Sequence, residues 1–199
     1  MNRGLIVLGG IVIVLVIVAM TVTSTYNRLV TLDQAVQSQW AQVESVYQRR
    51  ADLIPNLVET VKGAANFEKS TYIAVADARS KVGQLNLPRG APNDPAAFAK
   101  FTAAQDALSS ALSHLLAVVE NYPNLKASQN FADLQAQLEG TENRIAVERM
   151  RFNTAAQAFN TTRDSFPTVL VAGFFGARFN EKTYFKSQPG SETASPVKF

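Results

Sequence analysis

The sequence predicts an all-α protein in which a single N-terminal membrane helix precedes an antiparallel up-and-down bundle of about four helices. Three observations predict this fold class. Residues 5–22 form an uncharged apolar run, and the stretches that follow repeat their apolar side chains every three or four residues. No stretch of convincing length alternates apolar and polar residues as a strand does. With 199 residues, 47% of them hydrophobic, the chain fits one globular core plus an accessory segment.

The apolar run LIVLGGIVIVLVIVAMTV, residues 5–22, is predicted to span a membrane. At about 1.5 Å per residue such a helix is about 27 Å long, close to the thickness of a hydrocarbon core of about 30 Å. A cleaved signal peptide is the alternative, because Arg3 precedes the run. The run is too long for a signal-peptide core and lacks a clear cleavage site, which favours an uncleaved anchor over residues 1–25. Arg3 precedes the run and only Arg28 follows it closely, so the distribution of positive charge favours an N-terminus on the cytoplasmic side only slightly.

From Tyr26 a three-four repeat predicts a long amphipathic first helix of the bundle, about 35 residues, with Trp40 in its apolar stripe. Pro55 lies within this helix and lacks the amide hydrogen that the Ala51 carbonyl would accept, which costs about 3 kcal/mol in a straight helix. The stripe continues through the proline, so we expect a kink. A new helix with Asp52 as its N-cap is the alternative.

Three further helices complete the predicted bundle over residues 26–165. The first covers residues 67–82 and ends in the loop 83–95, which is rich in Pro, Gly and Asn. The second begins with Asp94 as N-cap and Pro95 at the first helical position, and continues to Val119. A turn is expected at NYPNL, residues 121–125, and the last helix over residues 128–164.

The polar stretch GTENRIAVERMRFN, residues 140–153, allows two interpretations. Its charges have the spacing of surface ion pairs within one helix, each contributing a few tenths of a kcal/mol. Alternatively, Glu142 and Asn143 face inward beside the apolar stripe and pair with Arg49 or Arg50 across the bundle. Such a pairing would set the register of the two helices.

An apolar membrane-proximal segment over residues 166–185 follows the last helix. If the chain leaves the membrane on the first of four helices, it returns on the fourth and places this segment near the bilayer. The segment either caps the open end of the bundle, or dips into the membrane interface or docks a partner. The side chains proposed for this role are Phe166, Pro167, Leu170, Phe174 and Phe175. The polar tail, residues 186–199, is predicted to be disordered.

A search for chemistry is largely negative. The chain has no cysteine and one histidine, His114, so the paired Glu-x-x-His motifs of di-iron bundles are excluded. His114 lies among leucines in the sequence, which favours a structural role. GxxxxGK, GxGxxG and GxSxG are all missing, and the mixed charges do not predict nucleic-acid binding. We therefore expect no cofactor, no metal and no enzymatic activity.

Several blocks together resemble the LemA family of bacterial membrane proteins. They are YNRLV at 26–30, Trp40, RRADLIPNLVETVKG at 49–63, ENRIAVERMRFN at 142–153 and FNTTRDSFPTVLVAGFFG at 159–176. The resemblance implies one N-terminal membrane helix and a soluble helical bundle. It does not imply a particular biochemical activity. It also implies a short outside N-terminus, opposite to the charge bias above. Some family members are encoded beside membrane zinc proteases, which points to envelope quality control.

The sequence thus predicts a scaffold or adaptor anchored in the bacterial cytoplasmic membrane by one span. Its partners would be the lipid bilayer and an envelope protein such as a membrane protease, with homo-oligomers left open. Candidate contact surfaces are Trp40, the 166–175 segment, and the DLIPNL segment with Asp52, Pro55 and Asn56. The rival hypothesis is a bundle that binds an amphiphile or lipid in a cavity lined by Phe152, Phe159 and Phe166.

Overall fold

The computed structural model describes residues 3–64, 67–84 and 91–186, and within these ranges the chain is helical without strands. The all-α prediction is confirmed. The elements in order are α1 (Arg3–Lys62), α2 (Lys69–Gly83), η1 (Ala91–Asn93), α3 (Pro95–Val119), α4 (Pro123–Lys126), α5 (Gln129–Asp164), α6 (Thr168–Phe175) and η2 (Gly176–Phe179). The tail predicted to be disordered lies outside the described residues, except for Lys186.

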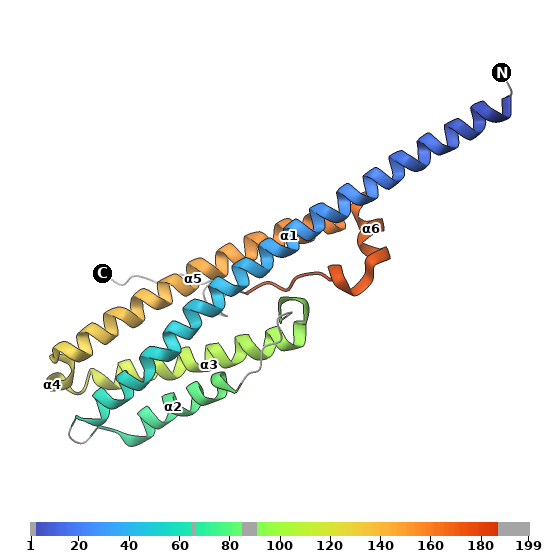
Figure 1. Ribbon diagram of the computed structural model, residues 1–199. Helices are drawn as coiled ribbons and strands as arrows, with labels where there is room; N and C mark the ends of the chain where they lie inside the picture. Colours follow the sequence, from blue (N-terminus) through green and yellow to red (C-terminus); the bar gives the residue numbers. More distant parts are fainter. Residues whose placement is uncertain (1–2, 65–66, 85–90, 187–199) are drawn as a thin grey trace, which may run out of the picture.

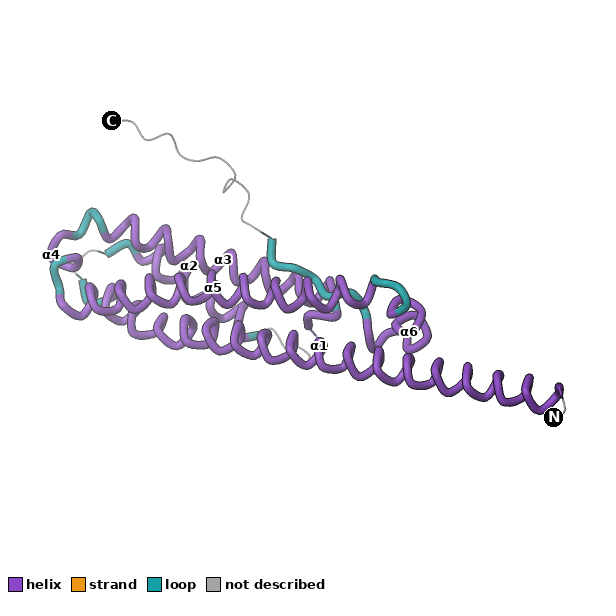
Figure 2. Tube along the Cα trace, turned by 90° about the horizontal axis from the view of Figure 1, so that it is seen from above, coloured by secondary structure: helices purple, strands orange, loops and turns teal. Residues whose placement is uncertain are grey.

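The four long helices alternate in direction along one axis (Figures 1 and 2). The helix α1 runs to the far end of the bundle, α2 returns, α3 runs out again and α5 comes back. The main packing pairs are α1 with α5, α2 with α3, and α1 with α2. The N-terminal part of α1 extends beyond the bundle alone, and α6 folds beside α1 where it leaves the bundle (Figure 1). The predicted up-and-down topology is therefore correct.

The helix α1 is one uninterrupted helix of 60 residues. The apolar run and the amphipathic stripe, which the sequence suggested as two pieces, share a single backbone. The run is long and apolar enough to cross a membrane, and no part of its most apolar window is buried inside the protein. From Leu29 onward, in contrast, a stripe of α1 side chains is buried against the bundle. The change from full exposure to burial marks where the bundle begins.

Pro55 does not end the helix, so a restart capped by Asp52 is wrong. The Ala51 carbonyl, which Pro55 leaves without its usual helical partner, instead accepts a hydrogen bond from Arg79 Nε on α2, at 2.9 Å. The Pro55 ring itself is exposed. The neighbouring helix therefore supplies the donor that the proline lacks, and α1 continues.

The starts of α3 and α5 follow the capping rules. The Asp94 carboxylate accepts hydrogen bonds from the amides of Ala96 and Ala97, at 2.9 and 3.1 Å. Ser128 accepts one from the Phe131 amide at 3.4 Å. The segment expected as a simple turn at 121–125 contains the short helix α4, which begins at Pro123.

The core has two parts. At the end of the bundle where α6 lies, which we call the α6 end, Trp40 is 3% exposed and lies among aromatic rings, with centroid distances of 5.2 Å to Phe101, 5.6 Å to Phe152 and 5.7 Å to Phe98. The far end is mainly aliphatic, built from leucines and valines of α1, α2, α3 and α5. The ring pairs around Trp40 have separations at which aromatic rings pack favourably, so the part of the core around Trp40 is filled by aromatic side chains.

Candidate functional sites

Arg50 connects three helices from the middle of α1. Its side chain is 1% exposed. Its Nη1 donates to Ser109 Oγ on α3 at 2.6 Å and to Glu142 Oε1 on α5 at 2.8 Å. Its Nη2 donates to the backbone and side-chain oxygens of Gln105. Both terminal nitrogens of the guanidinium are therefore paired, which offsets the cost of burying its charge, while its buried Nε has no hydrogen-bond partner among the described residues.

This arrangement decides between the two interpretations of the polar stretch, and each is right in part. Glu142 faces Arg50, as the inward interpretation predicts, although its side chain remains 43% exposed. Arg49 and Asn143 are exposed and do not join this network. Arg151 pairs with Glu148 at 2.8 Å on the helix surface, as the other interpretation predicts.

A second polar link lies one to two turns away on the same helices. Arg149 Nε donates to the Tyr47 hydroxyl at 2.5 Å, and Arg149 Nη2 pairs with Asp106 at 3.3 Å. Burial raises the pKa of Tyr47 above its ordinary value, and the nearby Arg149 and Arg50 charges partly oppose the increase. The tyrosine therefore stays neutral at physiological pH, and its hydroxyl accepts a hydrogen bond that links α1 to α5.

The C-terminal residues 180–186 form an extended segment that two asparagines of α5 hold in place. Asn160 donates to the Lys182 carbonyl at 2.9 Å and accepts from the Lys182 amide at 2.8 Å. Asn153, seven residues earlier on α5, makes the same pair of bonds with Phe185, at 2.8 and 2.9 Å. Each side-chain amide thus satisfies one residue's backbone donor and acceptor. We call residues 180–186 the strap.

The strap inserts two side chains into the bundle. The Phe185 ring lies 4.7 Å from Phe98 and 6.1 Å from Trp40 between centroids. The Lys182 ammonium is fully buried, 2.5 Å from Asp33 Oδ1 and 2.5 Å from Asn93 Oδ1, and lies over the Phe159 ring. The strap therefore runs from the α6 end along α5 and completes the core, a role that no signal in the sequence indicated.

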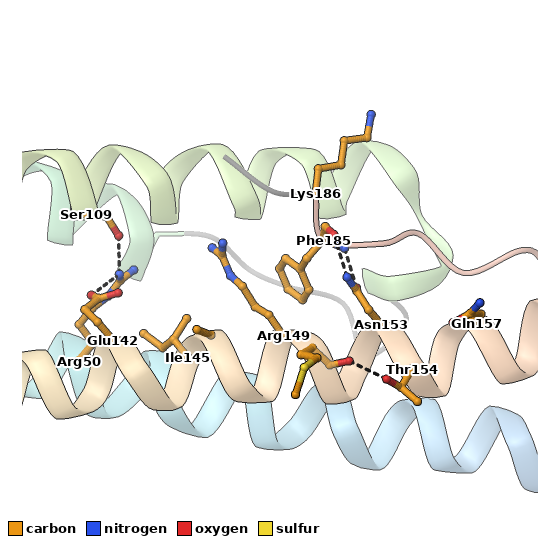
Figure 3. A pocket seen from close by; sticks show the side chains of 12 residues that line it. Arg50, Ser109, Glu142, Ile145, Arg149, Asn153, Thr154, Gln157, Phe185 and Lys186 are labelled. Carbon is orange, nitrogen blue, oxygen red and sulfur yellow. Dashed lines mark hydrogen bonds and ion pairs between the residues drawn. The ribbon is translucent and has the colours of Figure 1, made fainter. Parts of the chain in front are cut away.

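A groove continues along α5 beyond the end of the strap (Figure 3). Its volume is about 500 Å³, and its lining includes Arg50, Glu142, Arg149, Met150 and Phe185. A second groove of about 520 Å³ shares Ser109 and Glu142 with the first and continues between α3 and α5 toward the far end. We call the two together the α3–α5 groove. It lies on the outside of the bundle and combines apolar carbon with charged groups.

The helix α6 presents a different surface. Phe166, Leu170 and Phe174 are 81%, 65% and 85% exposed, and the α6 segment carries no charge. On its other face Val171 and Ala172 are buried. The Phe175 ring packs against Tyr26 of α1 with centroids 4.7 Å apart. The segment therefore does cap the end of the bundle, and it also displays large apolar side chains outward.

The remaining candidate residues fall into two groups. Trp40 is a core residue, so it cannot belong to an exposed contact surface. Asp52, Pro55 and Asn56 are exposed on α1, and Pro167 is exposed at the start of α6. His114, for which a structural role was expected, is exposed on α3. Gln105, Tyr47, Asn153, Asn160 and Lys182 are the polar residues that sequence reasoning missed.

The chain is similar in sequence to one protein family and to several named proteins. The sequence profile of the LemA family matches residues 39–199. Magnetosome protein MamQ of Magnetospirillum gryphiswaldense is 27% identical over 97% of this chain and 77% of its own length. Magnetosome protein MamQ 2 of Paramagnetospirillum magneticum is 26% identical over 87% and 69%. Protein LemA of Metamycoplasma hominis is 23% identical over 73% and 63%.

Proposed function

The chain belongs to the LemA family, and from this premise we propose that it is a membrane-anchored scaffold or adaptor that binds through its outer surface and catalyses no reaction. The apolar run of α1 would anchor it in the bacterial cytoplasmic membrane by a single span. The bundle would hold an envelope protein near the bilayer. A membrane protease is the partner class that envelope quality control would require.

One observation supports this proposal above the others: the aromatic core is filled. A bundle that binds an amphiphile needs a cavity lined by the aromatics Phe152, Phe159 and Phe166. Phe152 and Phe159 are both 0% exposed and pack against other rings, whereas Phe166 is 81% exposed outside the core. The three side chains do not line a shared space. This arrangement favours binding at the surface over binding inside the bundle.

The α3–α5 groove is the surface that best fits a protein partner. Next to the groove, α5 already holds an extended segment of this chain, the strap, through hydrogen bonds between the Asn153 side chain and the Phe185 backbone and through the inserted Phe185 ring. The open part is lined by exposed Met150 together with Glu142 and Arg149. An extended peptide with one apolar anchor and flanking polar groups matches this lining.

Photocrosslinking tests the scaffold role. A photoreactive residue at Met150, which is 62% exposed and lines the groove, should capture a discrete envelope protein in cells. The matched control is Ile73, a 40% exposed apolar position on α2 outside the groove. A protein adduct specific to position 150 would support the proposal. Adducts that are the same at both positions, or lipid adducts alone at 150, would contradict it.

The absence of catalysis is tested separately. Glu142 and Glu148 are the carboxylates that line or flank the polar network of α5. Detectable turnover by the purified protein that disappears in Glu142→Gln or Glu148→Gln, with folding unchanged, would replace the scaffold by an enzyme.

A further inference from the structure

The outward face of α6 is more apolar than the surface of a soluble helix would be. Phe166, Leu170 and Phe174 are each more than half exposed, and Val169 adds a further 41% exposed side chain. An uncharged face of this kind is costly in water, so it indicates that another phase or molecule covers it. The proposed partner groove lies elsewhere, along α5, and does not account for this surface.

The position of α6 along α1 identifies what covers it. A groove beside the start of α6 is lined by Phe166 and Pro167 together with Thr21, Ser24 and Thr25 of α1. Thr21 lies in the last turn of the apolar run 5–22, and Ser24 and Thr25 follow within three residues of its end. The α6 face is therefore level with the point where the membrane helix leaves the hydrocarbon core, and both figures show α6 beside α1 at this point (Figures 1 and 2).

The chemistry around α6 matches a lipid–water boundary. Tyr26 contacts Phe175 on α6, and the Arg178 guanidinium lies 5.2 Å from the Tyr26 ring centroid. Aromatic rings concentrate at membrane interfaces, and arginines near them extend toward the headgroups. The segment that carries the α6 face has no acidic residue, because Asp164 precedes Phe166 and the next acidic residue is Glu181.

We propose that α6 lies in the interface of the leaflet from which α1 emerges, with Phe166, Leu170 and Phe174 among the acyl chains. The protein would then contact the bilayer twice, through the α1 span and the α6 face, and the second contact would hold the bundle at one orientation relative to the membrane. Short interfacial helices bury their apolar face about 5–10 Å into the headgroup–acyl boundary. This inference rests on the membrane anchoring in the proposed function, and not on the partner groove.

Tryptophan quenching by lipids with brominated acyl chains tests the inference on the full chain in proteoliposomes. The protein has one tryptophan, the buried Trp40, so wild type supplies the baseline. Phe174→Trp probes the α6 face, and Val12→Trp in the apolar run is the positive control. Ile73→Trp, at an exposed apolar position on α2 remote from α6, is the matched negative control.

The expected result is a loss of Phe174→Trp emission comparable to that of Val12→Trp, with Ile73→Trp unchanged from the baseline. Strong quenching at position 12 together with none at position 174 overturns the α6 inference and leaves the anchor standing. No quenching at position 12 overturns the anchor and the α6 inference together. The tryptophan of Phe174→Trp could also emit as a side chain shielded from water and yet not be quenched by the brominated lipid. That result would mean that a protein contact covers the α6 face, and it would also overturn the inference.

Discussion

At the scale of single residues, Pro55 shows how a local defect is repaired from outside the helix. The missing amide was predictable because proline has none, and the affected acceptor, the Ala51 carbonyl, followed from the four-residue spacing. The replacement donor, Arg79 on α2, was not predictable, because nothing local relates position 79 to position 51. An α1 that continues through a proline therefore depends on α2.

We expect Arg79→Ala to lower the free energy of unfolding by about 1–2 kcal/mol, since the Ala51 carbonyl loses its partner in a partly buried position. In a Pro55→Ala background the cost should be smaller, because the new amide at 55 can donate to Ala51. Urea unfolding of the detergent-solubilised chain measures both values. Lys81→Ala, an exposed basic residue on the same helix, is the control. If Arg79→Ala lowered the free energy of unfolding equally in the wild-type and Pro55→Ala backgrounds, Arg79 would not be acting through the acceptor that Pro55 leaves free.

Tyr47 makes stability depend on pH in the alkaline range. Because burial raises its pKa in the folded state, the unfolded chain releases the phenolic proton first. The contribution of Tyr47 to the free energy of unfolding is fully present below its pKa in the unfolded chain, about 10. This contribution is lost as the pH rises through the pKa of Tyr47 in the folded protein. Stability of wild type should therefore fall more steeply above about pH 10 than that of Tyr47→Phe. Parallel curves from urea midpoints at increasing pH would refute this.

At the scale of elements, Arg50 sets the relative position of α1, α3 and α5. In the sequence the adjacent Arg49 and Arg50 looked equivalent, and helical periodicity alone left both open for pairing with Glu142. The structure buries only Arg50, because it lies on the same face of α1 as Tyr47 and Ile54, whereas Arg49 points outward.

Removing the buried guanidinium should be far more costly than removing its neighbour. Arg50→Ala is expected to destabilise the bundle by about 3 kcal/mol, since Gln105 and Ser109 lose their partner. Glu142→Ala should cost about 1 kcal/mol, because Glu142 is 43% exposed and Arg50 keeps its α3 partners. Arg49→Ala should stay within about 0.5 kcal/mol. The order of the three unfolding free energies is the measurement, and a reversed order would disprove the hub role.

The strap is a second element-scale feature, and its stability should depend on two amides. Asn160→Ala removes both hydrogen bonds to the Lys182 backbone, so the Lys182 amide should exchange with solvent about tenfold faster. Asn153→Ala should do the same at Phe185. Hydrogen–deuterium exchange resolved by residue measures the rates, with exposed Asn143→Ala as control. Unchanged protection in both variants would show that Phe185 and Lys182 side-chain packing alone holds the strap.

At the scale of the whole molecule, the continuity of α1 makes the protein a rod. One helix passes from the apolar run to the far end of the bundle, so no flexible joint lies between the span and the bundle in α1. The helix rises by 40 residue steps from Val22 to Lys62 (62 − 22), which correspond to about 60 Å along its axis. A partner held in the α3–α5 groove would therefore be kept at a defined height above the bilayer.

Energy transfer can measure that height. The chain has no cysteine, so a dye attached to Lys62→Cys labels one position. Its transfer to an acceptor in the lipid headgroups should be weak, in keeping with a separation of about 60 Å, while a dye at Arg28→Cys should transfer strongly. Similar transfer from both positions would mean that the bundle lies along the membrane surface.

Much of the architecture followed from the sequence because it depends on local rules. The apolar run, the three-four periodicity and the cap at Asp94 each involve residues within a few positions of one another. The α6 surface was predictable as apolar from its composition. Its division into a buried face with Val171 and an exposed face with Phe174 was not, because that depends on how η2 and Tyr26 pack around it.

The sequence by itself determined the fold class, the candidate membrane span, the order of the helices and the absence of a recognisable catalytic motif. The tertiary structure alone decided that Arg50 and not Arg49 meets Glu142, that Arg79 relieves Pro55, and that the strap enters the core. The physical reason is separation along the chain. Secondary structure and burial pattern arise from neighbours in sequence, whereas these contacts join residues 28 to 92 positions apart, whose meeting depends on the packing of whole helices.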